Sequence, residues 1–436
     1  MRKYFFYLIV ILAILCCSFI FSISSNKRYV ITDYGAISDS TTINTLAIQK
    51  TIDECAVHGG GVVVVPRGLF ISGAIFLKQH VSLMVEKDGV LKGSANQSDY
   101  PQIHTRWEGE ERLWTSAFIN AIGINDIELT GEGTIDGAGD VWVKNAPPRR
   151  RQQPTDSLRY GVQTPVMSLN NLPVPRLGRP RMICFDSCRN IKISGLHFHN
   201  EAVWCLHILY CTKVLVEHLN ITADHNIPSS DGIDIDSSDG VTVTDCFIDV
   251  NDDCISIKSG KDEDGLRVNR PSENIIIEKC HFAYGHGGVA MGSETSGGIK
   301  HIEVRDCLID AGNWAPIRFK TQPSRSGIVE DITYRNIILR DTRKAFEFNM
   351  EWRMVGTVRP PAKVLPLVRN IHLINISGNV NVAGDITGLK ESPIQGIVFK
   401  NCNISADKGL VMQYVTGVDV TGLKLNVKSG QAITYK

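Results

Sequence analysis

The sequence lacks an excess of charge of either sign, because 46 lysine and arginine residues balance 46 aspartate and glutamate residues in a chain of 436. A general affinity for nucleic acid or for an anionic membrane surface calls for a basic surplus, so neither is indicated as a partner. The length is enough for two ordinary domains or for one long repetitive domain.

Helical periodicity is equally scarce. Residues 44–61 show it most clearly, because apolar side chains recur at Leu46, Ile48, Ile52 and Cys55 and glycines follow from Gly59. This pattern predicts one short helix near the N-terminus. The rest of the chain after the first 24 residues consists mostly of short apolar runs separated by Gly, Asn, Asp and Ser, which is typical of strands and turns.

Long apolar runs are missing except at the start, where residues 4–23 follow Arg2 and Lys3. Ser22 and Ser24 suit the small-residue positions before a signal-peptide cleavage site, and the run is also long enough to span a bilayer uncleaved. We therefore expect residues 1–24 to be a signal peptide or an N-terminal membrane anchor, and residues 25–436 to form one domain. The protein is then exported, to the periplasm, the cell surface or the medium.

Ten of the twelve cysteines follow this leader, which in an exported protein suggests disulfides. Their placement favours a different role, because they recur inside strand-like runs such as "VTDCFID", "IEKCHFA" and "VRDCLID". A buried thiol behaves as a small apolar side chain. We expect most of these cysteines to pack in the core.

Six strand-like runs can be placed in register, each reading apolar, variable, apolar, variable. Since successive side chains of a strand point to opposite faces, the apolar pairs should enter a core: Leu206/Ile208, Ile233/Ile235, Ile255/Ile257, Val289/Met291, Ile317/Phe319 and Phe346/Phe348. The runs start 27, 22, 34, 28 and 29 residues apart, from Leu206 to Phe346. Fixed strands with connections of varying length are typical of a solenoid.

The alternative of a β-propeller is less well supported, because propeller blades repeat more evenly and carry an aromatic signature that is missing here. The prediction is an all-β fold: a single right-handed parallel β-helix with a short N-terminal capping helix. The faces opposite the core then carry two columns of side chains. One is His207, Asp234, Ser256, Ala290, Arg318 and Glu347, and the other is Leu209, Asp236, Lys258, Gly292, Lys320 and Asn349.

Acidic residues gather at the head of these strands. In the register above, Asp231 aligns with Asp253, and Asp252 aligns with His286. Because neighbouring strands lie about 4.8 Å apart, three carboxylates and an imidazole from three successive coils should converge. Such a cluster costs stability and is typical of a functional site.

Several carboxylates at one place suit glycoside hydrolysis, in which one acid protonates the leaving oxygen while another activates water or attacks. Like charges in proximity raise one pKa and so supply the protonated partner. Lys258, Arg318 and Lys320 follow on the same face, where they predict contacts with the carboxylates of an acidic polysaccharide. His207, in the outward column, is a further candidate for substrate contact, although a merely exposed histidine fits as well.

The ordered motifs "SSDGIDIDS", "NDDCISIKSG", "GHGG" and "RFK" resemble those of glycoside hydrolase family 28, the polygalacturonases and their relatives. The resemblance covers nearly all of the chain after the leader, because "DYGAISDSTTINTLAIQKTIDECA" is similar to the N-terminal cap of that family's β-helices. Two positions depart from the family pattern. Ser229 and Ser230 stand where Asn and Thr are usual, and Phe319 replaces an isoleucine at a position that should point into the core.

The resemblance implies an inverting hydrolase that cleaves α-galacturonosyl linkages, with carboxyl groups far enough apart to admit a water. It implies Asp252 as the general acid and Asp231 with Asp253 as the residues that activate water. It further implies that His286 tunes the acid and that Arg318 and Lys320 bind the galacturonate carboxylate. No cofactor or metal is expected, and the protein is expected to be a monomer.

Two alternatives from other classes stay open. A β-helix pectate or pectin lyase would eliminate rather than hydrolyse, and calcium held by the aspartates would assist it, although His286 is an unusual neighbour for calcium. A non-catalytic glycan-binding β-helix would need an aromatic platform, and the two outward columns contain none. Trp107, Trp114, Trp142 and Trp314 are interpreted as packing or loop residues.

One segment interrupts the repeat. Residues 143–182 contain repeated proline and an arginine run at Arg149, Arg150 and Arg151. A long loop within a compact fold is usually functional or disordered. Because this insertion precedes Trp204 by about one coil, we expect it to cover one end of the substrate groove. A blocked groove admits only a chain end, which predicts exo-action from the non-reducing end.

Overall fold

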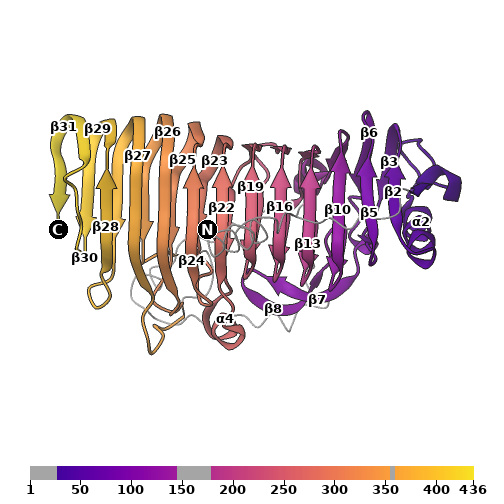
Figure 1. Ribbon diagram of the computed structural model, residues 1–436, viewed down its shortest axis with the longest axis horizontal. Coiled ribbons are helices and arrows are strands. Elements are labelled where there is room, and N and C mark those ends of the chain that lie inside the picture. Colours follow the sequence, from indigo (N-terminus) through magenta and orange to yellow (C-terminus); the bar gives the residue numbers. More distant parts are fainter. Residues whose placement is uncertain (1–26, 145–177, 354–358) are drawn as a thin grey trace, which may run out of the picture.

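The computed structural model describes residues 27–144, 178–353 and 359–436, and through them the chain winds as a right-handed parallel β-helix (Figure 1). The predicted fold is therefore confirmed. The predicted leader and most of the 143–182 insertion, with its three arginines, lie outside the described residues. No helix in the described ranges has the length and apolar character needed to cross a membrane.

Each complete coil contributes strands to three parallel sheets. Sheet 1 carries the predicted acidic cluster and contains β4 (Ile75–Phe76), β9 (Ile119–Ile122), β12 (Arg181–Asp186), β15 (Val203–Leu209), β18 (Ile233–Asp236), β21 (Asp253–Lys258) and the C-terminal parts of β23 (His281–Met291), β25 (Leu308–Lys320), β26 (Ile328–Asn349), β27 (Leu367–Thr387), β29 (Cys402–Gln413) and β31 (Leu423–Tyr435).

Sheet 2 contains β1 (Arg28–Val30), β2 (Gly61–Val65), β5 (Val81–Val85), β10 (Asn125–Gly131), β13 (Arg189–Ser194), β16 (Thr212–Glu217), β19 (Asp239–Thr244), β22 (Ser272–Glu278), β24 (Ile299–Arg305), the N-terminal parts of β26 and β27, β28 (Ile394–Lys400) and β30 (Val415–Thr416). Sheet 3 contains β3 (Gly68–Ser72), β6 (Gly89–Gly93), β11 (Thr134–Asp136), β14 (His197–His199), β17 (Asn220–Thr222), β20 (Phe247–Asp249) and the earlier parts of the long strands.

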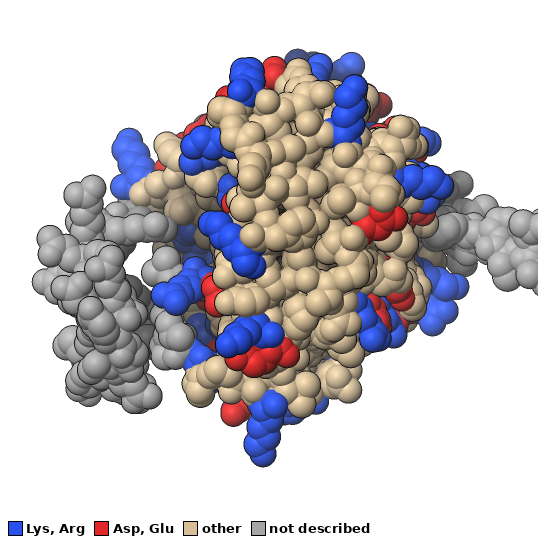
Figure 2. All heavy atoms as spheres, turned by 90° about the vertical axis from the view of Figure 1, so that its left-hand side faces the viewer, with Lys and Arg blue, Asp and Glu red and all other residues tan. Residues whose placement is uncertain are grey.

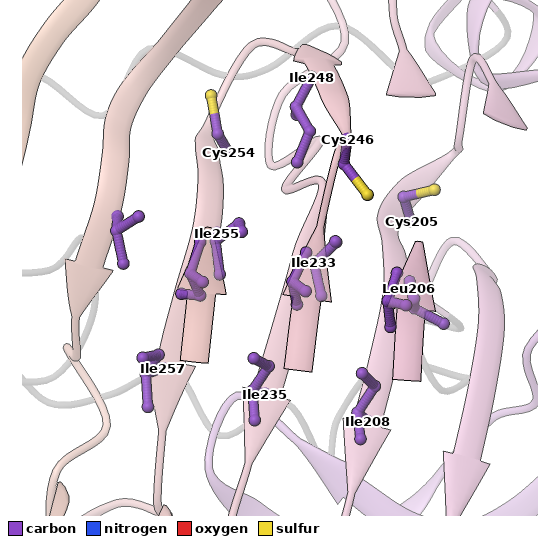
Figure 3. Packing of buried hydrophobic residues seen from close by; sticks show 14 of the residues in the cluster. Cys205, Leu206, Ile208, Ile233, Ile235, Cys246, Ile248, Cys254, Ile255 and Ile257 are labelled. Carbon is purple, nitrogen blue, oxygen red and sulfur yellow. The ribbon is translucent and has the colours of Figure 1, made fainter. Parts of the chain in front are cut away.

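The predicted register of sheet 1 is confirmed at every step. Leu206 pairs with Ile233, Ile233 with Ile255, Ile255 with Val289, Val289 with Ile317 and Ile317 with Phe346. These side chains are buried, and Figure 3 shows Leu206, Ile233 and Ile255 stacked from coil to coil along the core. The alternation of the strand thus fixes which side chains face outward.

The ten cysteines after the leader are all buried and unbridged. Cys205, Cys246 and Cys254 lie among the stacked isoleucines (Figure 3). The prediction that they pack as small apolar side chains is confirmed, and the core does not depend on disulfides in the described ranges.

The predicted capping helix is α2 (Thr45–Val57), which closes the N-terminal end of the solenoid (Figure 1). Ile48, Ile52 and Cys55 are buried on its inner face as predicted, but Leu46 is 86% exposed. Leu46 is two residues before Ile48, about 200° around the helix, and so points away from the core. The shorter helices are η1 (Ile31–Tyr34), η2 (Gln97–Asp99), α3 (Gly139–Lys144) and α4 (Asp262–Val268).

The opposite end of the solenoid is formed by the last coil, with β31 at its edge. Figure 2 looks onto this end and shows mostly uncharged surface at its centre, with lysine, arginine, aspartate and glutamate side chains nearer the rim. Lysines on edge strands hinder pairing with another chain, and β31 carries Lys424 and Lys428.

A two-stranded antiparallel hairpin stands apart from the coils. It consists of β7 (Gln102–Trp107) and β8 (Glu110–Thr115) and lies below the sheet edges in Figure 1. Its two-residue turn has positive φ at both Glu108 and Gly109, which is the backbone of a tight hairpin turn. This hairpin determines the shape of the site described next.

Candidate active site

The three predicted aspartates converge where β21 begins. One carboxylate oxygen from each of Asp231, Asp252 and Asp253 lies within 4.8 Å of the other two. The convergence follows from the register, because the Gly232 amide donates to the Asp253 carbonyl and Asp253 pairs with Gly287 in the next coil. Asp231 and Asp253 are almost fully buried, whereas the Asp252 side chain is 29% exposed. Asp252 is therefore the member of the cluster that reaches solvent.

The environment separates the pKa values of the buried aspartates. Burial raises the pKa of Asp231 well above its usual range, and the neighbouring Asp234 and Asp252 carboxylates add to this effect. Burial also opposes ionisation of Asp253, but Lys320 and Arg318 outweigh it and hold the pKa of Asp253 at about 2. The cluster thus keeps a proton near one carboxylate while another stays ionised.

The carboxyl groups were expected to lie far enough apart to admit a water, and their nearest oxygens lie close together. The oxygens lie within 4.8 Å of one another. Two hydrogen bonds of about 2.7 Å that share one water place their two carboxylate oxygens at a similar separation. A water can therefore sit between two of these carboxylates.

His286 lies beside the acid as predicted from the register. Its Nδ1 is 3.3 Å from Asp252 Oδ1, and its backbone amide donates to the Asp252 carbonyl at 2.8 Å. The hydrogen bond with Asp252 raises the pKa of His286, against the effect of burial. The Asp252 carboxylate thus favours the protonated form of the His286 imidazole.

Lys258 is held by carboxylates of the protein itself. Its Nζ lies 3.3 Å from Asp234 Oδ1, 3.3 Å from Glu294 Oε2 and 3.7 Å from Asp231 Oδ2. Burial disfavours the charged amine, but these three carboxylates outweigh it and raise the pKa of Lys258 well above its usual range. Its predicted contact with substrate stays a prediction, because it also serves as counter-ion to a buried acidic group.

Arg318 and Lys320 stand two residues apart on β25, so their side chains point to the same face. Lys320 Nζ bonds to Asp253 Oδ2, and Arg318 Nη1 lies 3.3 Å from Asp253 Oδ1. The Arg318 Nε donates to Glu347 Oε2 at 2.7 Å. Both cations border the cluster, as predicted, and both are already engaged by its carboxylates. Phe319 between them is buried, as predicted.

His207 requires a correction. It is fully buried, and its Nδ1 lies 2.5 Å from Arg181 Nη1 while its Nε2 lies 3.6 Å from Asp236 Oδ2. Burial lowers the pKa of His207 to about 4. It does point outward from the strand, but the hairpin covers it, so it is not exposed and offers no accessible surface for contact with a substrate.

The hairpin is bound over β15 and β18 by a fully buried ion pair. Arg106 on β7 donates from Nη1 to Asp236 Oδ1 at 2.7 Å and to Ser237 Oγ at 2.8 Å. Trp107 packs against Trp114 and Trp204. At the tip, the Lys261 amide donates to the Gly109 carbonyl at 2.9 Å. The outer face of sheet 1 is therefore closed from β15 to the start of α4.

Sequence reasoning missed this hairpin. The signal was present, since "QIHTRW" and "EERLWT" flank a two-residue Glu-Gly turn, which is typical of a hairpin. It was obscured because the predicted repeat consists of parallel strands. Trp107 and Trp114 were correctly interpreted as packing residues, and Glu294, a partner of Lys258, had no signal in the motifs.

Beyond β21 the outer face has a different cover. The Trp352 ring lies over both cations, 4.7 Å from Arg318 Cζ and 5.6 Å from Lys320 Nζ. The structure thus brings Trp352 to the site. Further along sheet 1 the outward side chains become accessible, and the side chain of Asp385 on β27 is 45% exposed.

The three aspartates also have the spacing of a hard-cation site. However, Lys320 and Arg318 already neutralise Asp253, and Lys258 approaches Asp231. A dication would have to displace or repel these three positive charges. The donor set therefore fits a metal poorly, and the calcium-assisted alternative gains no support from it.

Comparison with known proteins relates the chain to one family. Residues 61–423 match the family described as glycosyl hydrolases family 28. The chain is 28% identical over 407 residues to a probable polygalacturonase of Vitis vinifera, covering 91% of this chain and 78% of that protein. It is 28% identical over 417 residues to an exo-poly-alpha-D-galacturonosidase of Dickeya chrysanthemi, covering 86% and 67%.

A solved structure shows the same architecture. The exopolygalacturonase of Thermotoga maritima superimposes with a TM-score of 0.73 at 25% identity, covering 94% of this chain and 92% of that one. The family 28 exopolygalacturonase of Yersinia enterocolitica gives a TM-score of 0.78 at 22% identity, over 94% and 77%. The second likeness concerns the fold.

Proposed function

The chain belongs to the glycosyl hydrolases of family 28, and from this premise we propose that it is an inverting exo-acting hydrolase of galacturonan. It removes single galacturonic acid units from the non-reducing end of a pectic polysaccharide or oligosaccharide. The observation that carries the exo assignment is the hairpin β7–β8, which closes the outer face of sheet 1 immediately before the acidic cluster.

The proposed chemistry divides the cluster by exposure and charge. Asp252, which reaches solvent beside His286, protonates the leaving glycosidic oxygen. Asp253 stays ionised because Lys320 and Arg318 lower its pKa; with Asp231 it holds the attacking water, and its carboxylate accepts the proton that the water loses. Protonation by one carboxyl and attack by water on the opposite face of the sugar give inversion. The support for inversion is the family resemblance and the room for one water.

The exo assignment follows from where a chain can extend. Asp231 and Lys258 border the hairpin side, where Arg106 and Trp107 occupy the outer face of β15 and β18. A polysaccharide that crosses the coils meets this wall within about one sugar of the cluster. Its remaining length must run past β23 and β25, where Arg318 and Lys320 face the carboxylate of the leaving sugar.

The proposed substrate is acidic, with the family's galacturonan as the reference, and the named relatives support this. We also propose that the protein is exported and acts as a monomer. Support for export comes from the apolar run of residues 4–23 behind two basic residues.

Product analysis tests the reaction class. Incubation with homogalacturonan should release saturated galacturonic acid whose first-formed anomer is β, as observed by proton NMR during the first turnovers. A product that absorbs in the ultraviolet, and whose formation stops when calcium is chelated, would instead establish a calcium-dependent lyase. An α anomer as the first product would overturn inversion.

A further inference from the structure

The row of residues that begins with Asp252 and His286 continues to Trp314, which the proposed mechanism does not use. Asp253 pairs with Gly287 and Gly287 with Ala315, so the residues preceding them, Asp252, His286 and Trp314, occupy one row over three coils. Trp314 is 37% exposed. Its earlier interpretation as a packing or loop residue does not explain an accessible indole in line with the acid.

Arg343 on β26 stacks on this indole. Its guanidinium carbon lies 3.3 Å from the centre of the Trp314 ring, so the planar group rests flat on the aromatic face. Arg343 is exposed, and no carboxylate of the described residues lies within ion-pair distance of it. The indole thus orients a guanidinium that has no hydrogen-bond or ion-pair partner among the residues that the structure describes.

The other cations of this region are different. Lys258, Arg318 and Lys320 are buried against the carboxylates of the site. Lys344, next to Arg343 in sequence, pairs with Glu347 at 2.8 Å and with Asp385. A guanidinium without a counter-ion, held flat and facing solvent, is suited to bidentate binding of a carboxylate.

We infer that Trp314 and Arg343 form a binding subsite for a galacturonate carboxylate two sugars beyond the cleaved bond on the leaving-group side. The inference rests on the proposed function, which leaves this as the open direction for the chain. Trp314 lies one coil beyond His286 and Arg343 two coils beyond it, or roughly 5 to 10 Å. The first sugar of the leaving group faces Arg318 and Lys320, so this pair meets the next one.

Chain-length dependence provides the test. Arg343→Ala should lower kcat/KM for tetragalacturonate about tenfold, mainly through KM, because one bidentate charged contact is lost. With digalacturonate, which ends before the subsite, kcat/KM should stay within about twofold of the unchanged enzyme. Trp314→Phe keeps an aromatic base for the guanidinium and should lose less than Trp314→Ala. Arg343→Lys keeps the charge without the fork and should fall between.

A matched control is Arg335→Ala, which removes a half-exposed arginine of the same strand that pairs with Glu303 in sheet 2. It should leave both substrates unaffected. Equal losses on digalacturonate and tetragalacturonate, or no loss on tetragalacturonate, would overturn the subsite. If the proposed function fails instead, the unchanged enzyme will release no galacturonic acid from either substrate, which separates the two failures.

Discussion

The outer face of sheet 1 has two parts that share one fold and differ in cover. From β15 to β21 the hairpin presses onto the sheet, and His207, Leu209 and Asp236 are completely buried. From β25 to β27 the column that begins with His207 carries Arg318, Glu347 and Asp385, and accessibility increases along this series. The acidic cluster lies at the boundary between the closed part and the open part.

The difference shows how the two ends of one face of a regular solenoid become unequal. Parallel coils alone would give a face that is equivalent at both ends, along which a polysaccharide could bind anywhere. The antiparallel hairpin β7–β8, which the chain inserts between β6 and β9, closes one side only. The strand positions then keep their register while their surroundings change from buried to accessible.

The largest effect is expected at the boundary itself. Asp252→Asn should lower kcat by roughly 10²-fold or more, because an amide cannot donate the required proton. The thermal midpoint should change little, since Asp252 is partly exposed and not part of the core. Initial rates and a melting curve on the same preparation check this. Near-normal turnover in a folded Asp252→Asn protein would remove Asp252 from the role of acid.

The second prediction concerns the anchor of the hairpin, whose removal should lower the free energy of unfolding. Arg106→Ala leaves Asp236 buried without its partner, and removal of one member of a buried pair costs about 3–5 kcal/mol. Denaturant unfolding measures this against Arg112→Ala, a half-exposed change on the same hairpin expected within about 0.5 kcal/mol. If both variants lose the same small amount, the hairpin is not anchored through Arg106.

The third prediction concerns Lys320, which lies on the open side of the acidic cluster. Lys320→Ala should reduce kcat/KM roughly tenfold or more on galacturonan, and less on carboxyl-reduced substrate. Lys320 also holds the pKa of Asp253 low, so its removal should shift the acid limb of the pH–rate profile to higher pH. An unchanged acid limb together with equal losses on both substrates would mean that Lys320 has only a structural role.

The smallest effect concerns Glu201, a fully buried carboxyl near the closed part. Burial raises the pKa of Glu201 to about 8, and Asp234 adds to this. The folded state therefore binds a proton that the unfolded state has released between about pH 4.5 and 8, so this residue makes stability fall as pH rises through that window. Glu201→Gln should flatten this fall in denaturant unfolding, whereas the exposed control Glu132→Gln should not. An unchanged slope would contradict the buried ionisation.

The sequence was sufficient for whatever depends on alternation within a strand. The pairs Leu206/Ile208 to Phe346/Phe348 specify the register, and the register brings Asp231, Asp252, Asp253 and His286 together without further information. It was insufficient where a distant segment packs onto the sheet. His207 points outward as expected. However, Thr105 and Arg106, which lie more than 70 positions earlier in the chain, bond to its neighbour Arg181 and bury this part of the sheet.

The sequence was also insufficient to predict how the charged side chains pair. The motifs place Arg318 and Lys320 beside the aspartates, but their pairing with Asp253 and Glu347 depends on rotamers and on the coil that follows. The open-side pair Trp314 and Arg343 was not distinguishable from loop residues, because 29 positions separate them in sequence and their stacking appears only in three dimensions.

The closed and open parts together predict one mode of attack, and a time course on a reducing-end-labelled oligogalacturonide tests it most directly. An enzyme closed at the hairpin should shorten the labelled chain by one unit at a time, with galacturonic acid as the only unlabelled product. Early unlabelled oligomers of intermediate length would show that chains pass through the closed part, which would contradict the role assigned to the hairpin.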